Sequence, residues 1–273
     1  MRARAALFDV FGDYLRSRGD AAPIAALLRL LAPLGVTAPA VRTAVSRMVR
    51  QGWLTPAHLP DGPGYRLTAR GVRRLDDAGA RIYRTGQEPW DGRWHLLVVA
   101  PPAGRGARLR LSADLAFLGY GAIEATTWLA ARQSPEVAAL IVQHGARVES
   151  FVAVHTGDPR AMIDRAWDLD QLAAAYARFV DDLTPVVGSV GPDAADEDAF
   201  AARTALVHGW RNFLFTDPEL PAQLLPPDWA GTKAAAFFDT EASRLLPAAA
   251  RFVDSCLRPA EQDRGVAFRA SGQ

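Results

Sequence analysis

The chain has 273 residues, 49% of them hydrophobic and 22% charged, and its formal net charge is +1 at pH 7. This length allows two or three domains with their own cores, and the apolar fraction excludes a mainly disordered protein. No apolar run approaches the ~18 residues of a membrane span, and no signal peptide opens the chain. Cys256 has no second cysteine with which to form a disulfide. We therefore expect a cytoplasmic protein without a membrane partner.

Apolar residues at helical spacing predict two helices before residue 36. The first helix is marked by Leu7, Phe8, Phe11, Tyr14 and Leu15, and the second by Ile24, Leu27, Leu28, Leu31 and Leu34. Pro23 fits the start of the second helix, and Gly35 fits its end.

A third, amphipathic helix is predicted between Thr37 and Trp53. Thr37 can cap its start, Pro39 fits its first turn and Gly52 fits a left-handed residue after its end. One face is apolar: Val41, Ala44, Val45, Met48 and Val49. The opposite face is polar and rich in arginine: Arg42, Thr43, Ser46, Arg47 and Arg50. Only a short turn separates this helix from the second, which is the order of a helix-turn-helix with the third helix placed to enter the major groove.

The residues after Gly52 predict a wing. Two short strands, Trp53–Thr55 and Tyr65–Leu67, bracket a loop over Pro60–Gly64 that is rich in proline and glycine. Thr68 can then cap a fourth helix that continues to about Arg84. We therefore expect residues 1–87 to form a winged helix-turn-helix domain.

Charge is divided unevenly along the chain. Residues 1–84 hold 14 arginines and 6 aspartates with no lysine or glutamate, a net charge of +8, so residues 85–273 sum to −7. A basic head on an acidic body indicates a polyanionic partner at one end, and we expect double-stranded DNA. The predicted DNA-binding residues are Thr37, Arg42, Thr43, Ser46, Arg47, Arg50, Tyr65 and Arg66; the alternative is a solvated helix face.

The rest of the chain predicts an α+β fold followed by helices. Strands are expected over Trp94–Ala100, Ala122–Ala130 and Arg147–His155, with helices over Arg108–Leu118 and Pro135–His144 between them. This alternation is typical of a ferredoxin-like domain, here residues 88–157. Residues 158–273 predict an all-α domain with one long helix from Asp158 past Leu183, and further helices over Phe200–Phe215 and Lys233–Leu257.

Several segments resemble one known family in their order and spacing. They are residues 7–14 (LFDVFGDY), 41–54 (VRTAVSRMVRQGWL), 65–68 (YRLT), 89–94 (PWDGRW) and 217–231 (DPELPAQLLPPDWAG). Over nearly the whole chain they look like the PaaX family of transcriptional repressors. The resemblance implies a homodimeric repressor of aromatic-acid (phenylacetate-type) catabolism, released from its operator by an aryl-CoA effector such as phenylacetyl-CoA. The wing departs from the family pattern of adjacent arginines, since it holds Asp61 and the single Arg66.

No residue is assigned to the effector. The C-terminal third offers aromatic side chains at Trp167, Tyr176, Trp210 and Phe213, and cations at Arg165, Arg178, Arg203 and Arg211. Aromatic residues at helical spacing are also typical of a core, and arginines of a surface. The charge of −7 leaves a smaller or uncharged aromatic effector open.

The sequence indicates no enzyme. Its five histidines are scattered, and no metal, nucleophile or phosphate-loop motif is present, so we expect no catalytic residues, metal or cofactor. The middle domain also resembles the Cas2 fold, whose nucleases hold a metal with an acidic residue after the first strand; this chain has Pro101–Gly104 there. The alternatives are a Cas2-descended metal-dependent nuclease, a regulator of an unrelated pathway with another small-molecule effector, and a protein-interaction adaptor.

Overall fold

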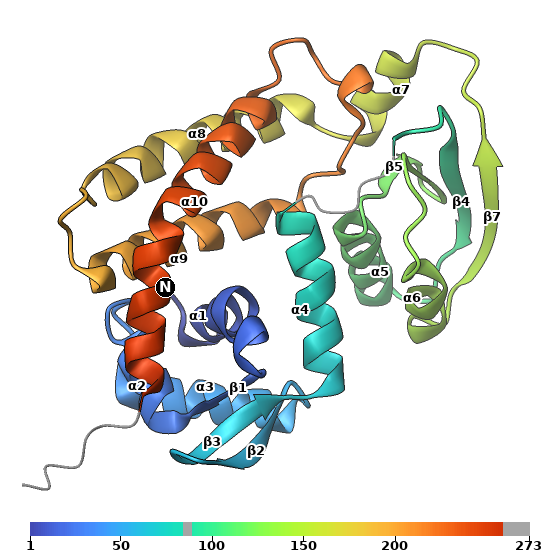
Figure 1. The fold of residues 1–273 in the computed structure, drawn as a ribbon. Coiled ribbons are helices and arrows are strands. Elements are labelled where there is room, and N and C mark those ends of the chain that lie inside the picture. Colours follow the sequence, from blue (N-terminus) through green and yellow to red (C-terminus); the bar gives the residue numbers. More distant parts are fainter. Residues whose placement is uncertain (84–88, 259–273) are drawn as a thin grey trace, which may run out of the picture. The chain divides into compact units, whose positions relative to one another are not determined.

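A computed structural model describes residues 1–83 and 89–258 (Figure 1). By their contacts these residues form two compact units. Unit 1 contains Met1–Gly79, Val190–Thr204 and the residues from Arg244 onward, and unit 2 contains Ala80–Ser189 and Ala205–Ser243. The division into domains 1–87, 88–157 and 158–273 stays a prediction.

The three N-terminal helices of unit 1 are confirmed. They are α1 (Ala3–Val10), α2 (Ile24–Leu31) and α3 (Ala38–Arg50), and a π turn over Phe11–Leu15 and a 3₁₀ turn over Arg16–Arg18 follow α1. Helix α2 ends at Leu31, earlier than expected, and the chain reaches Gly35 in a turn, where the backbone φ is +70°. Glycine adopts this left-handed conformation without steric cost.

The segment predicted as a wing belongs to a three-stranded antiparallel sheet of order β1-β3-β2. Its strands are β1 (Ala21–Pro23), β2 (Leu54–Leu59) and β3 (Gly62–Leu67). The predicted loop over Pro60–Gly64 is wrong, because only Pro60 and Asp61 join the two long strands. Strand β1 was not predicted; it approaches β3 so closely that a Cβ on Gly64 would lie 2.5 Å from the Ala22 carbonyl oxygen.

Helix α4 (Ala69–Ile82) follows the wing. The Thr68 hydroxyl oxygen accepts a hydrogen bond from the Gly71 N–H at 3.1 Å, which confirms Thr68 as the cap. The same hydroxyl donates to the Gly52 carbonyl oxygen at 2.7 Å. One side chain thus joins the end of α3 to the start of α4.

The core of unit 1 is built from three separate stretches of chain. Buried residues of α1 to α3, among them Leu7 and Val41, share one apolar cluster with Phe200 of α9 (Asp196–Arg211) and Val253 of α10 (Ala230–Leu257). Beside this cluster Arg203 is buried and ion-paired with Asp13. Burial lowers the pKa of Arg203 to about 10.

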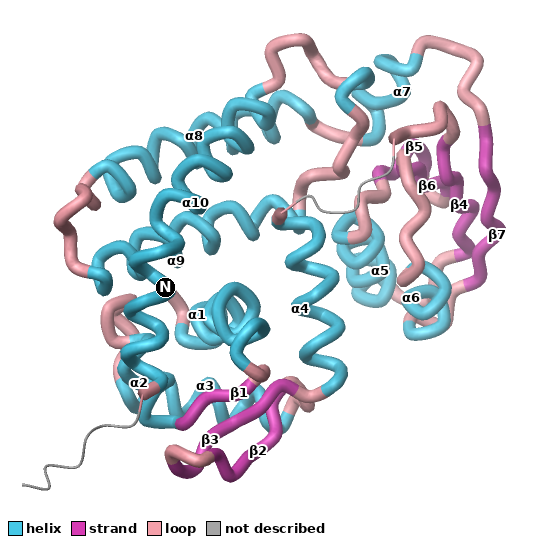
Figure 2. Tube along the Cα trace, viewed as in Figure 1, coloured by secondary structure: helices cyan, strands magenta, loops and turns pink. Residues whose placement is uncertain are grey.

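Unit 2 contains the predicted ferredoxin-like fold. Its elements are β4 (Trp94–Ala100), α5 (Arg105–Phe117), β5 (Gly121–Glu124), β6 (Thr127–Ala130), α6 (Val137–Gln143) and β7 (Arg147–Ala153). The strands pair antiparallel in the order β5-β6-β4-β7, and α5 and α6 cover one face of the sheet (Figure 2). The single strand predicted over Ala122–Ala130 is wrong, because this segment folds into the β5–β6 hairpin.

Helices complete unit 2. The long helix predicted from Asp158 is wrong: it is divided into α7 (Pro159–Ala166) and α8 (Leu169–Gly188). The chain is extended at Trp167, and the Asp168 carboxylate accepts the Gln171 N–H at 2.8 Å, which starts a new helix. Short 3₁₀ turns occupy Asn212–Phe215 and Ala222–Leu224. Among the described residues, none of the helices has the length and apolar character needed to cross a membrane.

Candidate nucleic-acid interface

The ends of α3 are set by local sequence. Pro39 lies in the first turn, where its missing N–H removes no helical hydrogen bond. At the other end Gly52 has φ +72°, and the Gly52 and Trp53 N–H groups bond to the Val49 and Met48 carbonyls, a Schellman ending. Thr37 occupies the capping position with extended backbone, but its side chain makes no capping hydrogen bond; that expectation is wrong.

Helix α3 divides into a buried and an exposed face, as its sequence predicts. The buried side chains are Val41, Ala44, Val45 and Met48, and Val49 is half-buried. The exposed ones are Arg42, Thr43, Ser46, Arg47 and Arg50, with Thr37 exposed before the first turn. The apolar face anchors the helix in the unit 1 core, so the polar face is fixed in orientation.

The three arginines of this face are available to a partner. Within residues 1–83 and 89–258, the guanidinium groups of Arg42, Arg47 and Arg50 form no hydrogen bond or ion pair, and α3 itself contains no acidic residue. At a helical rise of about 1.5 Å per residue, they span about 12 Å along the helix. A row of uncompensated positive charge of this length suits the edge of a groove lined by phosphates.

The wing offers less positive charge. The Arg66 guanidinium donates to the Gly19 carbonyl oxygen at 2.6 Å, and Tyr65 is half-buried, while the exposed tip carries Asp61. Helix α4 carries two exposed arginines besides the predicted DNA-binding residues. Arg70 lies 4.3 Å from the centre of the Trp53 ring, and Arg73 is exposed. Both lie in the first two turns of α4.

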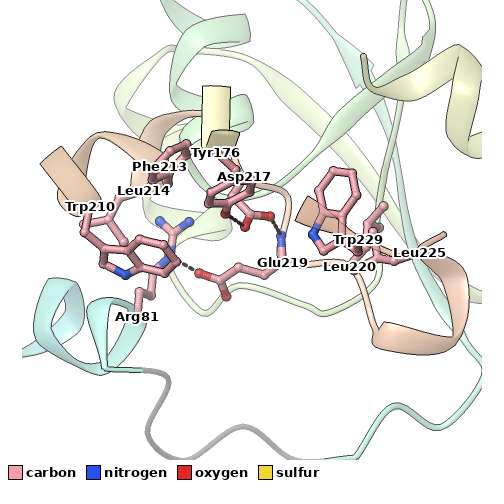
Figure 3. A pocket seen from close by; sticks show the side chains of 10 residues that line it. All are labelled: Arg81, Tyr176, Trp210, Phe213, Leu214, Asp217, Glu219, Leu220, Leu225 and Trp229. Atoms are coloured by element: carbon pink, nitrogen blue, oxygen red, sulfur yellow. Dashed lines mark hydrogen bonds and ion pairs between the residues drawn. The ribbon is translucent and has the colours of Figure 1, made fainter. Parts of the chain in front are cut away.

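The residues considered for the effector separate into different places in the structure. Tyr176, Trp210 and Phe213 line one cavity of about 150 Å³ in unit 2 (Figure 3). Trp167 stacks instead on Trp94, with ring centres 6.4 Å apart. The four arginines named with them do not line this cavity: Arg203 pairs with Asp13 in unit 1, Arg165 pairs with Glu124 at 2.7 Å, Arg178 is exposed and Arg211 lies 3.4 Å from His208.

Two of the five histidines, His95 and His144, form hydrogen bonds or ion pairs with residues of the fold. Buried His95 contacts the Tyr120 hydroxyl at 2.5 Å and the Ser150 hydroxyl at 2.7 Å, and burial lowers its pKa. His144 contacts the Asp114 carboxylate at 2.7 Å. In the part of the chain that the structure describes, no group of three or more histidine, cysteine or acidic side chains is arranged to hold a metal ion.

Comparison with known proteins covers almost the whole chain. Residues 2–71 match the sequence model of the PaaX-like protein, residues 87–165 that of the PaaX protein central Cas2-like domain, and residues 167–255 that of the PaaX-like protein C-terminal domain. The transcriptional repressor PaaX of Escherichia coli (strain K12) is 29% identical over 256 residues, covering 89% of this chain and 80% of that protein. A solved structure, the uncharacterized protein Rv0674 from Mycobacterium tuberculosis, is similar with a TM-score of 0.63 and 25% identity, covering 93% of this chain and 98% of that one.

Proposed function

Because the chain belongs to the PaaX-like protein family, we propose that it is a transcriptional repressor that binds operator DNA through α3. The observation that carries this proposal is the exposed, unpaired arginine face of α3, between a helix that packs behind it and a wing that follows it. A chromosomal operator makes the cytoplasm the place of action.

Side chains of α3 have two roles in this proposal. Arg42, Thr43, Ser46 and Arg47 contact base edges, since they lie toward the start and on the outer face of the helix. Arg50, in the last turn, contacts phosphate, and Thr37 contacts the backbone at the entry to the helix. In the wing, Arg66 is held by a backbone carbonyl, so Tyr65 and Arg66 make a minor contribution.

The operator requires two copies of α3. A single helix contacts few base pairs, and a two-fold homodimer doubles the contact over half-sites about one helical turn, or a multiple of it, apart. We propose that the dimer is formed outside the α3 surface, because that surface must stay free for DNA.

We further propose that the regulated genes belong to aromatic-acid catabolism of the phenylacetate type, with an aryl-CoA such as phenylacetyl-CoA as the effector that relieves repression. An effector releases the operator only if it binds the DNA-incompetent conformation more tightly than the competent one. The similarity to the transcriptional repressor PaaX supports the regulatory role.

Selection of duplexes from a random-sequence pool by the full chain tests the DNA-binding role. We expect enriched inverted repeats whose centres are about 10 base pairs, or a multiple, apart. A triple variant, Arg42→Ala/Arg47→Ala/Arg50→Ala, should enrich nothing, whereas Arg160→Ala, at an exposed arginine of α7, should enrich the same repeats. A pool that stays random with the unmodified chain would overturn the proposal.

A further inference from the structure

The cavity of unit 2 in Figure 3 has aromatic walls from three segments of chain. Tyr176 comes from α8, Trp210 and Phe213 from the end of α9 and the turn after it, and Trp229 from the segment before α10. The Tyr176 and Phe213 rings are stacked with centres 4.0 Å apart. A cavity of about 150 Å³ with apolar walls is large enough for one benzene ring.

The segment 217–231, which carries the conspicuous DPELPAQLLPPDWAG sequence, closes one side of this cavity. Asp217, Glu219, Leu220, Leu225 and Trp229 all line it. Glu219 has φ +55°, an uncommon conformation for a residue other than glycine, and such conformations cluster at ligand sites.

The acids of the cavity are already engaged. The Asp217 carboxylate accepts hydrogen bonds from the Tyr176 hydroxyl and, at 2.7 Å, from the Glu219 N–H. The Glu219 carboxylate accepts from Arg81 Nε at 2.5 Å, and Arg81 also donates to the Phe117 carbonyl oxygen at 2.9 Å. The aromatic cavity therefore offers walls for a ring. Within unit 2 its Glu219 carboxylate is ion-paired with Arg81, and its Asp217 carboxylate is hydrogen-bonded.

A second cavity of unit 2, of about 200 Å³, shares Arg81 and Glu219 with the first. Its lining includes the polar side chains of Arg132, Gln133 and Ser134 beside apolar residues such as Leu118 and Ala130. Among the described residues, the Arg132 Nε atom is buried and has no hydrogen-bond partner. An unpaired buried donor is costly, and an acceptor oxygen of a ligand would satisfy it.

We propose that the two cavities are the two halves of one effector site, for a one-ring aromatic acid or an acyl derivative of it. The ring lies among Tyr176, Phe213 and Trp229, and a carboxylate or acyl oxygen accepts a hydrogen bond from Arg132 beyond the Arg81–Glu219 pair. The inference rests on the proposed function in taking the protein as a ligand-responsive regulator. Arg81 belongs to the last turn of α4, so a ligand at this pair acts on the helix that follows the wing in the chain.

The same ring and oxygen could come from a free acid or from its CoA thioester. Titration calorimetry of the full chain with benzoate, phenylacetate, 3-phenylpropionate and phenylacetyl-CoA separates these sources. Saturable binding of one ligand per chain is expected with at least one compound, and either source supports the site. Absence of heat with all four compounds, confirmed by an unchanged tryptophan fluorescence, would overturn it.

Two substitutions place the ligand. Arg132→Met removes the unpaired donor and should weaken binding by about tenfold or more, since hydrogen bonds to charged groups contribute about 1.5–3 kcal/mol. Leu225→Trp fills the aromatic cavity and should abolish binding, and the control Arg160→Met should leave it unchanged. Binding that survives both cavity variants would overturn the location.

Failure of the effector-site proposal can be distinguished from failure of the DNA-binding proposal. Both cavity variants leave α3 intact and should bind the selected operator as the unmodified chain does when no ligand is present. The α3 triple variant should keep its ligand affinity. Loss of operator binding in Arg132→Met without ligand would indicate a disturbed fold. Arg132→Lys, which keeps a donor and the charge, should then restore both operator binding and ligand binding, and a variant that restores only operator binding would show that Arg132 contributes more than a donor to the site. If neither substitution of Arg132 changes ligand affinity, the proposal fails.

Discussion

Single substitutions of Arg42, Arg47 and Arg50 should separate base contacts from phosphate contacts. A bidentate arginine–guanine pair discriminates by about 1–3 kcal/mol, and a two-fold dimer loses two such pairs, so about 2–6 kcal/mol. Arg47→Ala or Arg42→Ala should therefore weaken operator binding by roughly 30-fold or more. Because these side chains are exposed and unpaired in the described structure, the free energy of unfolding should change by less than about 0.5 kcal/mol.

Arg50→Ala should behave differently. Loss of a phosphate contact weakens binding to any duplex and lowers the slope of log K against log salt by about 0.9 for each contact, thus by about 2 for a dimer. Fluorescence anisotropy with the selected operator and a scrambled duplex, at several salt concentrations, measures both quantities. Arg160→Ala is the matched control.

The refuting result is a loss of equal size on both duplexes for Arg42→Ala and Arg47→Ala. These side chains would then contact only the DNA backbone, and sequence discrimination would have to come from DNA shape or from other residues.

Three further predictions concern stability. Gly64→Ala should destabilise unit 1 by about 1–3 kcal/mol in urea unfolding, because the new Cβ would clash with backbone atoms. The control Gly79→Ala, with open space at its Cβ, should be neutral or stabilise by up to about 1 kcal/mol. Equal effects of the two substitutions would contradict this packing. Arg203→Met should cost about 3–5 kcal/mol by leaving buried Asp13 without its ion pair, and the double change with Asp13→Leu should cost less than the sum of the two single changes. Burial lowers the pKa of His95, so the unfolded chain takes up a proton near pH 6.5 before the folded one does, and stability should fall as pH falls below about 6.5; an equal fall in His95→Asn would assign it to other groups.

The elements that are predicted correctly are those whose ends and faces are determined by residues within their own sequence. Helix α3 has a proline in its first turn, a glycine after its end and an apolar stripe between them, so both its ends and its exposed face follow from local sequence. The polar face of Arg42 to Arg50 is confirmed as exposed for the same reason. Whether this face contacts DNA stays a proposal.

The missed elements depend on partners distant in the sequence. Strand β1 has three residues, too few for a period, and exists because it pairs with β3 more than forty residues later. The turn between β5 and β6 contains neither glycine nor proline, and apolar spacing continues across the break at Trp167. The cavity residues Arg81 and Arg132 come from segments fifty residues apart, so no local motif joins them.

The core of unit 1 combines stretches of chain that the ribosome synthesises far apart in time. Tyr14 packs on Phe200, with ring centres 5.3 Å apart, and Phe200 packs on Phe252 at 5.1 Å. A ribosome delivers the first of these side chains more than 230 residues before the last, so the N-terminal part of unit 1 can complete its core only when translation is nearly finished. A nascent or truncated chain presents the arginine face of α3 on a core that lacks the side chains of α9 and α10. Grafting the first eighty residues onto another protein would therefore transfer a domain with an incomplete core.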